Sequence, residues 1–357
     1  MHRLFEPLAF RRGPEMRNRF MLAPLTNQQS CEDGTLSDDE YKWLVMRAAG
    51  GFGAIMTCGA YVVPSGKCFP GQLGIASDSQ IEGLTRLATG IKSEGSLAIV
   101  QLFHAGNRSP AEMIGQAPLY PVDDPATGAR AMTTAEVEAL VEEFVIAAQR
   151  AEKAGFDGVE LHGAHGYLPS IFLSPTINLR TDKYGGSLEN RSRFVREILA
   201  GIDKACGPQF SIGLRLSAER FGLEVEETCQ IAQELMSEAT IDYLDVSLWD
   251  SFKEPADERL QGRSLMSYFT ELDRGDVRLG VAGKIMSAMD AKACIDAGAD
   301  FVLNGRAAIL HHNFPHRIQK NESFESEPVP VTRAYLEAEG LAPPFIKYMD
   351  DFFGFVK

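Results

Sequence analysis

The feature that most constrains the fold is an alternation that runs through the sequence, in which short apolar runs typical of buried strands are each followed by helical periodicity. Eight such runs recur, at residues 20–23, 54–58, 97–102, 158–161, 210–216, 243–248, 277–281 and 301–303. Continuous apolar strands joined by helices form parallel sheets that are covered on both faces. Eight such units in one chain predict the α/β class and a single (β/α)8 TIM barrel.

Helix start and stop signals support this alternation. Ser37 with Glu40, and Thr133 with Glu136, have the spacing of an N-terminal capping box. The apolar residues after Thr133 fall on one helical face: Val137, Leu140, Val141, Phe144, Val145 and Ala148. Gly155 then stands where a C-terminal cap belongs. These signals predict capped helices between the strands.

An open, doubly wound sheet is the alternative to a barrel. That fold leads us to expect a G-x-G-x-x-G turn after the first strand, where this sequence has Ala23-Pro-Leu-Thr-Asn27. The barrel is therefore favoured, and no internal boundary is needed. We expect one cofactor-binding barrel domain over residues 1–357, in which residues 323–357 form a proline-rich tail packed on the exterior of the barrel.

Composition excludes several classes of protein. A hydrophobic fraction of 45% in 357 residues supports a large core. The net charge of −14 and the lack of a Lys/Arg-rich run argue against a nucleic-acid partner. The six cysteines form no CxxC pair, and no apolar run approaches the length of a signal core or a membrane span. We expect a soluble cytoplasmic protein with reduced thiols and no membrane partner; a homo-oligomer stays open.

Polar side chains follow the apolar runs, and in barrels the catalytic groups lie at the C-terminal ends of strands. The fourth run is the most informative, because His162, His165 and Tyr167 come directly after it. The other strand ends carry Thr26, Ala60, Gln101, His104 and Arg215. Two imidazoles and a phenol after a buried strand indicate the edge of an active site.

The seventh and eighth runs end in glycine followed by a basic residue, Gly283-Lys284 and Gly305-Arg306. The loops after these strands commonly hold a phosphate in barrels, because glycine lets backbone amides approach the oxygens while Lys and Arg supply charge. A phosphate site on one side of the mouth, with polar strand ends across it, predicts a flat phosphorylated cofactor.

Each of these residues also has a simpler interpretation. His162 and His165 could hold a metal ion or pack beneath the following loop, although no third ligand stands at a strand end and we expect Glu160 to point to the opposite face. Tyr167 could be a packing residue, and Arg215 could satisfy a carboxylate between strands. Gly305-Arg306 could form only a tight turn.

The stretch that follows, residues 172–191, is long, irregular and rich in turn formers, which indicates a binding surface rather than a connector. The sequence from His162 to Arg191 resembles the signature of the old yellow enzyme family, flavin-dependent reductases of activated double bonds. The resemblance covers nearly the whole chain through further blocks: Leu4-Phe-Glu-Pro-Leu8, Arg17-Asn-Arg-Phe-Met-Leu-Ala-Pro-Leu-Thr26, Gln101-Leu-Phe-His-Ala-Gly106 and Asn304-Gly-Arg306.

The resemblance implies FMN as a tightly bound cofactor and assigns roles by motif. Contacts to the flavin ring would come from Ala23, Pro24, Leu25, Thr26, Ala60, Gln101, His162 and Arg215, with the Thr26 hydroxyl near a flavin carbonyl. Gly283, Gly305 and Arg306 would hold the phosphate. His162 and His165 resemble the donor pair that binds a substrate oxygen, and Tyr167 resembles the acid that protonates the substrate.

The implied activity is that of an ene-reductase, in which hydride passes from NAD(P)H through the flavin to the β-carbon of an α,β-unsaturated carbonyl or nitro compound. A metal-dependent hydrolase using the two histidines, and a flavin-binding module that senses redox state without turnover, are the alternatives. Gln28-Gln29 stands where some members place an aromatic substrate contact, and residues 106–131 follow no family pattern. The sequence leaves open the physiological substrate and the choice between NADH and NADPH.

Overall fold

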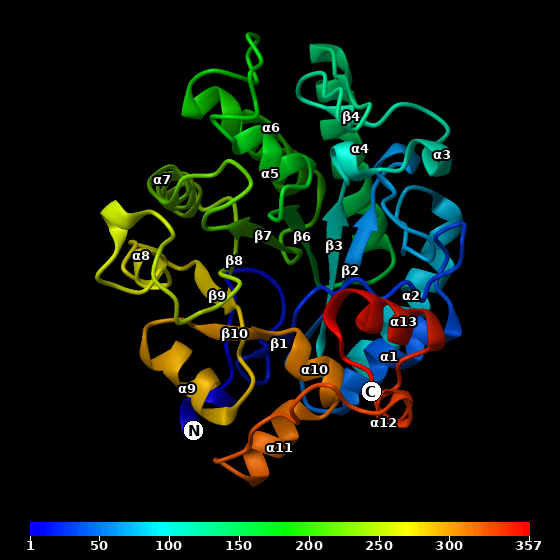
Figure 1. Ribbon diagram of the computed structural model, residues 1–357, viewed down its shortest axis with the longest axis vertical. Coiled ribbons are helices and arrows are strands. Elements are labelled where there is room, and N and C mark those ends of the chain that lie inside the picture. Colours follow the sequence, from blue (N-terminus) through cyan, green and yellow to red (C-terminus); the bar gives the residue numbers. More distant parts are fainter.

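The computed structural model describes residues 1–357 apart from the side chain of Phe352, and its parallel strands close into a barrel (Figure 1). The order around the barrel is β1-β10-β9-β8-β7-β6-β3-β2. These strands are β1 (Phe20–Leu22), β2 (Ala54–Tyr61), β3 (Leu97–Phe103), β6 (Gly158–Gly163), β7 (Ser211–Ser217), β8 (Tyr243–Ser247), β9 (Arg278–Ala282) and β10 (Phe301–Asn304). The predicted (β/α)8 fold is therefore confirmed, and each apolar run became one strand.

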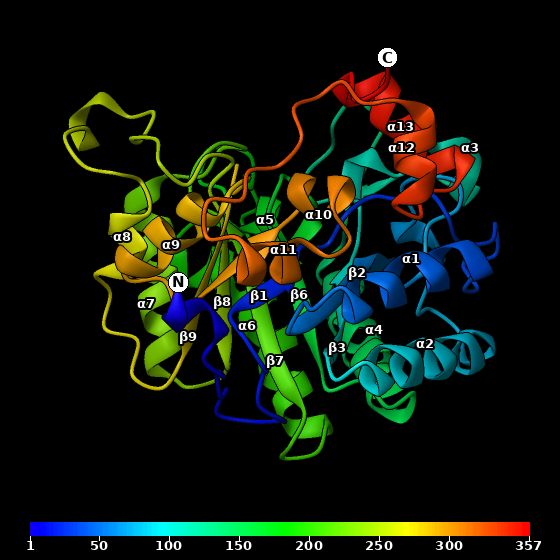
Figure 2. The ribbon, with the colours of Figure 1, turned by 90° about the horizontal axis from the view of Figure 1, so that it is seen from below.

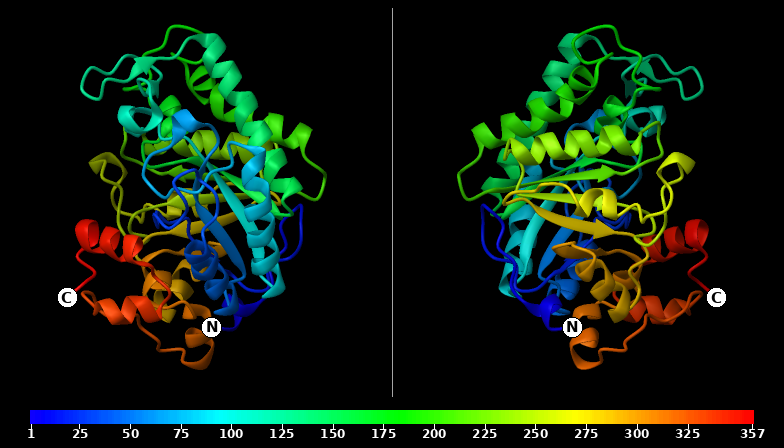
Figure 3. Two further views of the ribbon diagram at one scale, coloured as in Figure 1. Left: turned by 90° about the vertical axis from the view of Figure 1, so that its right-hand side faces the viewer. Right: turned by 90° about the vertical axis from the view of Figure 1, so that its left-hand side faces the viewer.

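Helices cover the outside of the strand ring, as Figure 2 and Figure 3 show from three sides. The helices between barrel strands are α1 (Asp38–Ala49), α2 (Ile81–Ser93), α3 (Ala111–Ile114), α4 (Thr134–Lys153), α5 (Leu168–Leu173), α6 (Leu188–Ala205), α7 (Val225–Ser237), α8 (Ser267–Thr270) and α9 (Ala288–Asp296). After β10 come α10 (Arg306–Leu310), α11 (Phe314–Lys320), α12 (Arg333–Ala338) and α13 (Pro343–Phe353). A small separate sheet, β4 (Leu119–Tyr120) with β5 (Arg130–Ala131), lies in the connection after β3.

The predicted caps formed to different extents. At α4, Thr133 and Glu136 make the reciprocal capping box, and Gly155 follows the helix with φ of +87°. At α1, the Ser37 side chain accepts from the backbone N–H of Glu40, but the Glu40 carboxylate is buried and accepts from Asn27 at 2.9 Å instead. That second box is therefore only half formed, because Glu40 is used in the core.

The interior of the barrel has an apolar lower layer. Inward side chains of the strands, such as Met21, Met56 and Phe301, pack there in one cluster. The N-terminal segment adds Leu8, Phe10 and Met16 to the same cluster, and Leu8 and Met16 form an antiparallel bridge. This segment therefore closes the end of the barrel where the strands begin, which leaves the other end for polar side chains.

The C-terminal tail lies against α1 (Figure 1, Figure 2). Phe345 of α13 packs edge-on against Trp43 of α1, with ring centroids 5.3 Å apart. Arg47 is fully buried and donates to the backbone oxygen of Glu339 at 2.7 Å, and the backbone N–H of Ala342 donates to Gln29 Oε1 at 2.7 Å. These contacts bring α13 to the mouth of the barrel.

Candidate active site at the mouth of the barrel

A pocket opens at the C-terminal ends of the strands and collects most of the predicted site residues. Predicted side chains that line it are Pro24, Thr26, Gln101, His162, His165, Tyr167 and Arg215; the sequence analysis did not name Gly59, Phe69, Gln72 or Phe103, which also line it. The lining comes from β1, β2, β3, β6 and β7 and from the loops that follow them. The structure therefore joins residues that lie almost two hundred positions apart in the chain.

Strand register explains why these side chains meet. Gln101 is paired with Glu160, His162 with Arg215, and Arg215 with Asp245 around the ring. Because alternate residues of a strand face the same side, Glu160 and His162 both point into the barrel. Our expectation that Glu160 points to the opposite face was wrong: its Oε1 accepts from Gln101 Nε2 at 2.8 Å.

Two buried carboxyl groups and one arginine form the layer beneath the pocket. Arg215 Nε lies 3.2 Å from Asp245 Oδ2, and the Asp245 side chain has no exposed surface. Burial raises the pKa of Asp245 to about 6, and the positive charge of Arg215 opposes that rise. Burial, followed by the charge of Asp245, raises the pKa of Glu160 well above its ordinary value. Glu160 is therefore the neutral member of the layer.

The two histidines stand above this layer as neutral donors. Their ring centroids are 5.1 Å apart, and His162 Nδ1 is buried without a hydrogen-bond partner among the described residues. Burial is the main cause that lowers the pKa of both rings, that of His165 to about 3, and Arg215 and Arg108 act in the same direction. An imidazole that stays uncharged carries one N–H proton, which it can offer to an oxygen atom.

Tyr167 lies beside these rings at the start of α5. Its ring centroid is 5.1 Å from that of His162 and 4.5 Å from that of Phe103. Burial, followed by the nearby Cys68, raises the pKa of Tyr167 to about 12, while Arg108 opposes the rise. The Arg108 guanidinium lies 4.9 Å from the ring centroid. Tyr167 thus keeps its proton throughout the neutral range.

Arg108 belongs to η4 (Gly106–Arg108), at the start of the loop to which the sequence analysis assigned no role. Phe103 carried a detectable signal, since it lies two residues after Gln101 and so faces the same side of β3. Phe69 and Gln72 come from the irregular connection after β2 and carried none. His104 does not reach the pocket: it is fully buried, and its Nδ1 accepts from the backbone N–H of Gly106 at 3.0 Å.

The side chain of Ala60, a predicted contact of the flavin ring, does not line the pocket. The pairing of β2 with β3 shifts between Met56 and Gly59, so that three steps along β2 match two along β3. This bulge reverses the alternation of β2. Met56 still faces the lower barrel layer, but Ala60 then packs in the core formed with the surrounding helices, and Gly59 lines the pocket instead.

The glycines predicted to bind phosphate follow neighbouring strands, because β9 and β10 are paired in parallel. A Cβ on Gly283 would come within 2.8 Å of the backbone N of Asp250, so this position requires glycine. At Gly305 the nearest atom to such a Cβ would be Leu25 Cδ2, at 3.4 Å, which is ordinary van der Waals contact. Lys284 Nζ is paired with Asp250 at 2.9 Å. Arg306 is exposed and has no ion pair with any described residue.

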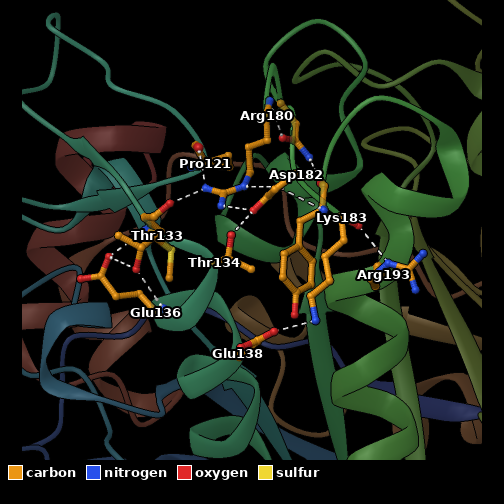
Figure 4. A network of polar contacts seen from close by, with 12 residues as sticks. Pro121, Thr133, Thr134, Glu136, Glu138, Arg180, Asp182, Lys183 and Arg193 are labelled. Carbon is orange, nitrogen blue, oxygen red and sulfur yellow. Dashed lines mark hydrogen bonds and ion pairs between the residues drawn. The ribbon is translucent and has the colours of Figure 1, made fainter.

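The long stretch over residues 172–191 makes contacts to a neighbouring loop through Arg180. Arg180 donates to the backbone oxygens of Pro121 and Met132, at 3.0 and 2.5 Å, and makes two hydrogen bonds to Asp182, whose carboxylate also accepts from Thr134 at 2.6 Å (Figure 4). This stretch therefore fastens the loop after β6 to the loop after β3. The pocket at the barrel mouth takes its residues from the first part of the signature, and a binding role for residues 172–191 stays a prediction.

A closed barrel with this mouth, carrying two neutral imidazoles, a protonated phenol and an arginine beside glycine-lined strand ends, defines an enzyme scaffold for a flat phosphorylated cofactor. The sequence profile of the NADH:flavin oxidoreductase / NADH oxidase family matches residues 3–325. The probable NADH-dependent flavin oxidoreductase YqiG of Bacillus subtilis is 36% identical over 95% of this chain and 97% of its own. Against several longer relatives the chain spans only 34% to 50% of their length.

Solved structures give the same relationship. Morphinone reductase in complex with tetrahydroNAD is 30% identical with a TM-score of 0.79, covering 93% of both chains. An old yellow enzyme homologue from Zymomonas mobilis is 26% identical with a TM-score of 0.80, covering 93% of this chain and 96% of that one. The chain belongs to the NADH:flavin oxidoreductase / NADH oxidase family, the old yellow enzyme family, and is an NAD(P)H-dependent FMN oxidoreductase.

The residues present fit FMN. The pocket offers the unpartnered His162 Nδ1 and the Arg215 guanidinium. Gly283 follows β9, and Gly305 precedes the helix that starts at Arg306, which has no ion pair in the described part of the chain. Among all residues that the structure describes, no group of three His, Cys, Asp or Glu side chains is arranged to hold a metal ion. No helix that the structure describes is both long enough and apolar enough to cross a membrane.

Proposed function

We propose that this enzyme reduces α,β-unsaturated carbonyl or nitro compounds, with His162 and His165 binding the substrate oxygen and Tyr167 protonating the α-carbon. The observation that carries the proposal is that these three polar side chains share one pocket with Arg215 and Gln101. When bound, FMN supplies hydride transfer from NAD(P)H to the β-carbon of the substrate.

The two histidines suit an oxygen that gains negative charge during reduction. Both rings are uncharged because burial holds their pKa values far below neutral pH. A preorganised donor in a dry pocket stabilises such charge more than a donor in water does, and loss of one donor typically costs about 10²–10³ in rate. A substrate with a carbonyl or nitro oxygen is the simplest partner for this pair.

Tyr167 suits the proton transfer. Its hydroxyl stays protonated because its pKa is raised to about 12, and its ring is held between Phe103 and the Arg108 guanidinium. An acid with so high a pKa releases its proton only to a strongly basic atom, such as a carbanion-like α-carbon. Arg108 would then stabilise the phenolate that is left.

On the cofactor side, Pro24, Thr26, Gln101 and Arg215 would hold the flavin ring, and Gly283, Gly305 and Arg306 would hold its phosphate. The contacts of Gln101 with Glu160 and of Arg215 with Asp245 hold both side chains in place before any ligand arrives. Ala23, Leu25 and Ala60 stay predicted contacts of the ring. The structure places Ala23 in the lower barrel cluster and Leu25 partly buried next to Gly305.

The test is a visible spectrum of the purified enzyme, followed by titration with a para-substituted phenol and by turnover with NAD(P)H and cyclohexenone. We expect a flavin spectrum, a long-wavelength charge-transfer band on phenol binding and multiple turnovers. A flavin-loaded enzyme that forms no such band and does not reduce cyclohexenone, while the His162→Ala/His165→Ala variant behaves identically, would refute the proposed substrate class.

We also propose a cytoplasmic location. The cysteines are all free: Cys31, Cys58, Cys68, Cys206, Cys229 and Cys294. Unpaired thiols persist in reducing compartments, which supports the proposal. Cell fractionation with an antibody against the enzyme tests it.

A further inference from the structure

Ser247 is a small polar residue that contacts both His165 and Arg215. It ends β8, and its Oγ lies 2.7 Å from His165 Nε2. Arg215 Nη2 donates to the same oxygen at 3.4 Å. One hydroxyl therefore connects the arginine on the cofactor side to a histidine on the substrate side.

The chemistry of the groups fixes one of these hydrogen bonds: a guanidinium can only donate, so Ser247 Oγ is the acceptor toward Arg215. The hydroxyl keeps a second lone pair, so this contact alone leaves both directions open toward His165. The positive charge of Arg215 beside it favours the arrangement in which Ser247 donates its proton and His165 Nε2 presents a lone pair. A neutral imidazole with an accepting Nε2 carries its proton on Nδ1.

We propose that Ser247 is a positioning residue that fixes His165 in the neutral tautomer with the proton on Nδ1. Given the proposed role of His165 in binding the substrate oxygen, on which this consequence rests, Nδ1 is then the donor atom of that ring. The Ser247 hydroxyl is the only described side chain with a hydrogen bond to the His165 ring, so its loss leaves Nε2 without that partner.

The surroundings of His165 support one fixed tautomer. Its backbone has a positive φ of +61°, which a residue with a side chain adopts only when its contacts hold it there. Its backbone N–H donates to Ser217 Oγ at 2.9 Å, which holds the main chain in that conformation. The charged groups Arg215 and Arg108 disfavour protonation of the ring, so the positively charged form does not compete.

Ser217 also provides a matched control, because it is the residue paired with Ser247 on the adjacent strand. Its hydroxyl contacts the backbone of His165, whereas that of Ser247 contacts the ring. Removing either serine deletes one hydroxyl next to His165, but only Ser247→Ala removes the hydrogen bond to Nε2.

The experiment is ¹⁵N NMR of the FMN-loaded enzyme labelled at histidine, with the His165 signals assigned from their loss in His165→Gln. In the parent we expect a protonated Nδ1 and an unprotonated Nε2. Ser247→Ala should lose this preference, whereas Ser217→Ala and Ser247→Thr should keep it. A parent enzyme protonated at Nε2, or a Ser247→Ala variant with the parental tautomer, would overturn the inference.

Phenol titration of the same variants separates this inference from the proposed function. We expect Ser247→Ala to bind a para-substituted phenol about tenfold more weakly and Ser247→Thr to bind it nearly as the parent does. A changed tautomer in Ser247→Ala with unchanged phenol affinity would support the role of Ser247 and refute oxygen binding by His165.

Discussion

At the scale of single residues, Tyr167 gives the sharpest separation between catalysis and packing. Tyr167→Phe removes one hydroxyl and keeps the ring that contacts Phe103 and His162. If Tyr167 is the acid, reoxidation of the enzyme by cyclohexenone should slow by about 10²–10⁴, while its reduction by NAD(P)H stays nearly unchanged. Stopped-flow absorbance of the flavin measures both half-reactions.

Nitro substrates provide the control for Tyr167→Phe. A nitronate product can leave without a proton on carbon, so reoxidation by a nitroalkene should be much less affected. Equal slowing for enones and nitroalkenes would mean that the substitution disrupts the pocket in general. No slowing for enones would leave Tyr167 with a packing role.

Arg306 is the residue on which the phosphate assignment depends most directly. It is exposed at the start of α10, directly after Gly305. Arg306→Ala should lower FMN affinity and yield largely apo protein, because a guanidinium–phosphate contact is charge-assisted; Arg306→Lys should retain part of the affinity. Fluorescence titration of apo protein with FMN measures this, and equal affinities in all three proteins would leave Arg306 only its place in a turn.

Glu160 and Glu136 predict opposite dependences of stability on pH. Burial raises the pKa of Glu160, so above about pH 4.3 the unfolded chain loses the Glu160 proton while the folded chain keeps it. The stability of the parent relative to Glu160→Gln should therefore fall as the pH rises above about 4.3. Hydrogen bonds from Arg130 and then from the Thr133 backbone lower the pKa of Glu136 to about 2. The advantage of the parent over Glu136→Gln should therefore be present above about 4.3 and be lost as the pH falls toward 2.

Urea unfolding of the three proteins between about pH 3.5 and 7.5 tests this pair. The two stability differences should have slopes of opposite sign. Slopes of the same sign would mean that Glu160 is ionised in the folded enzyme, and that Asp245 rather than Glu160 is the neutral carboxyl group beneath the pocket.

The sequence predicted the residues that follow strands but not those that arrive from irregular loops. His162, Tyr167 and Arg215 could be named because a strand end fixes which residues face the mouth. Arg108 could not, because nothing local says that η4 folds back over Tyr167. Ser247 lies on a predicted strand, yet its importance depends on the distances to His165 and Arg215, which only the fold creates.

At the scale of elements, periodicity predicted every barrel strand and the capped helix α4, because both patterns repeat over many residues. The bulge in β2 escaped prediction, since one extra residue leaves the apolar run intact while it reverses the facing of Ala60. The role of the signature stretch stays a prediction for another reason. Turn-forming residues indicate an irregular backbone, but they do not say whether that backbone faces a ligand or a neighbouring loop.

Arg180 tests the packing role of that stretch. Its side chain is only 8% exposed, and it joins Asp182 to the backbone of the loop after β3 (Figure 4). Arg180→Ala should lower the free energy of unfolding by about 2 kcal/mol or more and speed hydrogen exchange over residues 119–134, without weakening FMN binding. Lys183→Ala is the control, because Lys183 and its partner Glu138 are about half exposed and such pairs contribute about 0–1 kcal/mol. If Arg180→Ala bound FMN more weakly and left hydrogen exchange over residues 119–134 unchanged, the result would support a binding role for residues 172–191.

At the scale of the whole molecule, two distant segments complete the barrel. Residues 8–16 fill its lower end, and α13 reaches its mouth from the other terminus. The sequence predicted a tail on the exterior of the barrel, but neither the approach of α13 to the mouth nor the closure by residues 8–16 could be predicted, because both depend on contacts between the ends of the chain and its middle. Near Gln28-Gln29, Tyr348 of α13 lies beside Thr26, and Gln29 Oε1 accepts from the backbone N–H of Ala342.

Tyr348 therefore predicts that the tail influences the cofactor. The Thr26 hydroxyl is the predicted hydrogen-bond partner of a flavin carbonyl, and in this structure it also contacts Tyr348. Tyr348→Phe removes that contact but keeps the ring in α13. The enzyme should therefore lose only about 1 kcal/mol of stability. Its flavin spectrum and midpoint potential should shift in the opposite direction to those of Thr26→Ala. Lys347→Ala, an exposed neighbour paired only with Asp351 among the described residues, should change none of these quantities. If Thr26→Ala shifted the potential and Tyr348→Phe did not, the tail would have a purely structural role at the mouth of the barrel.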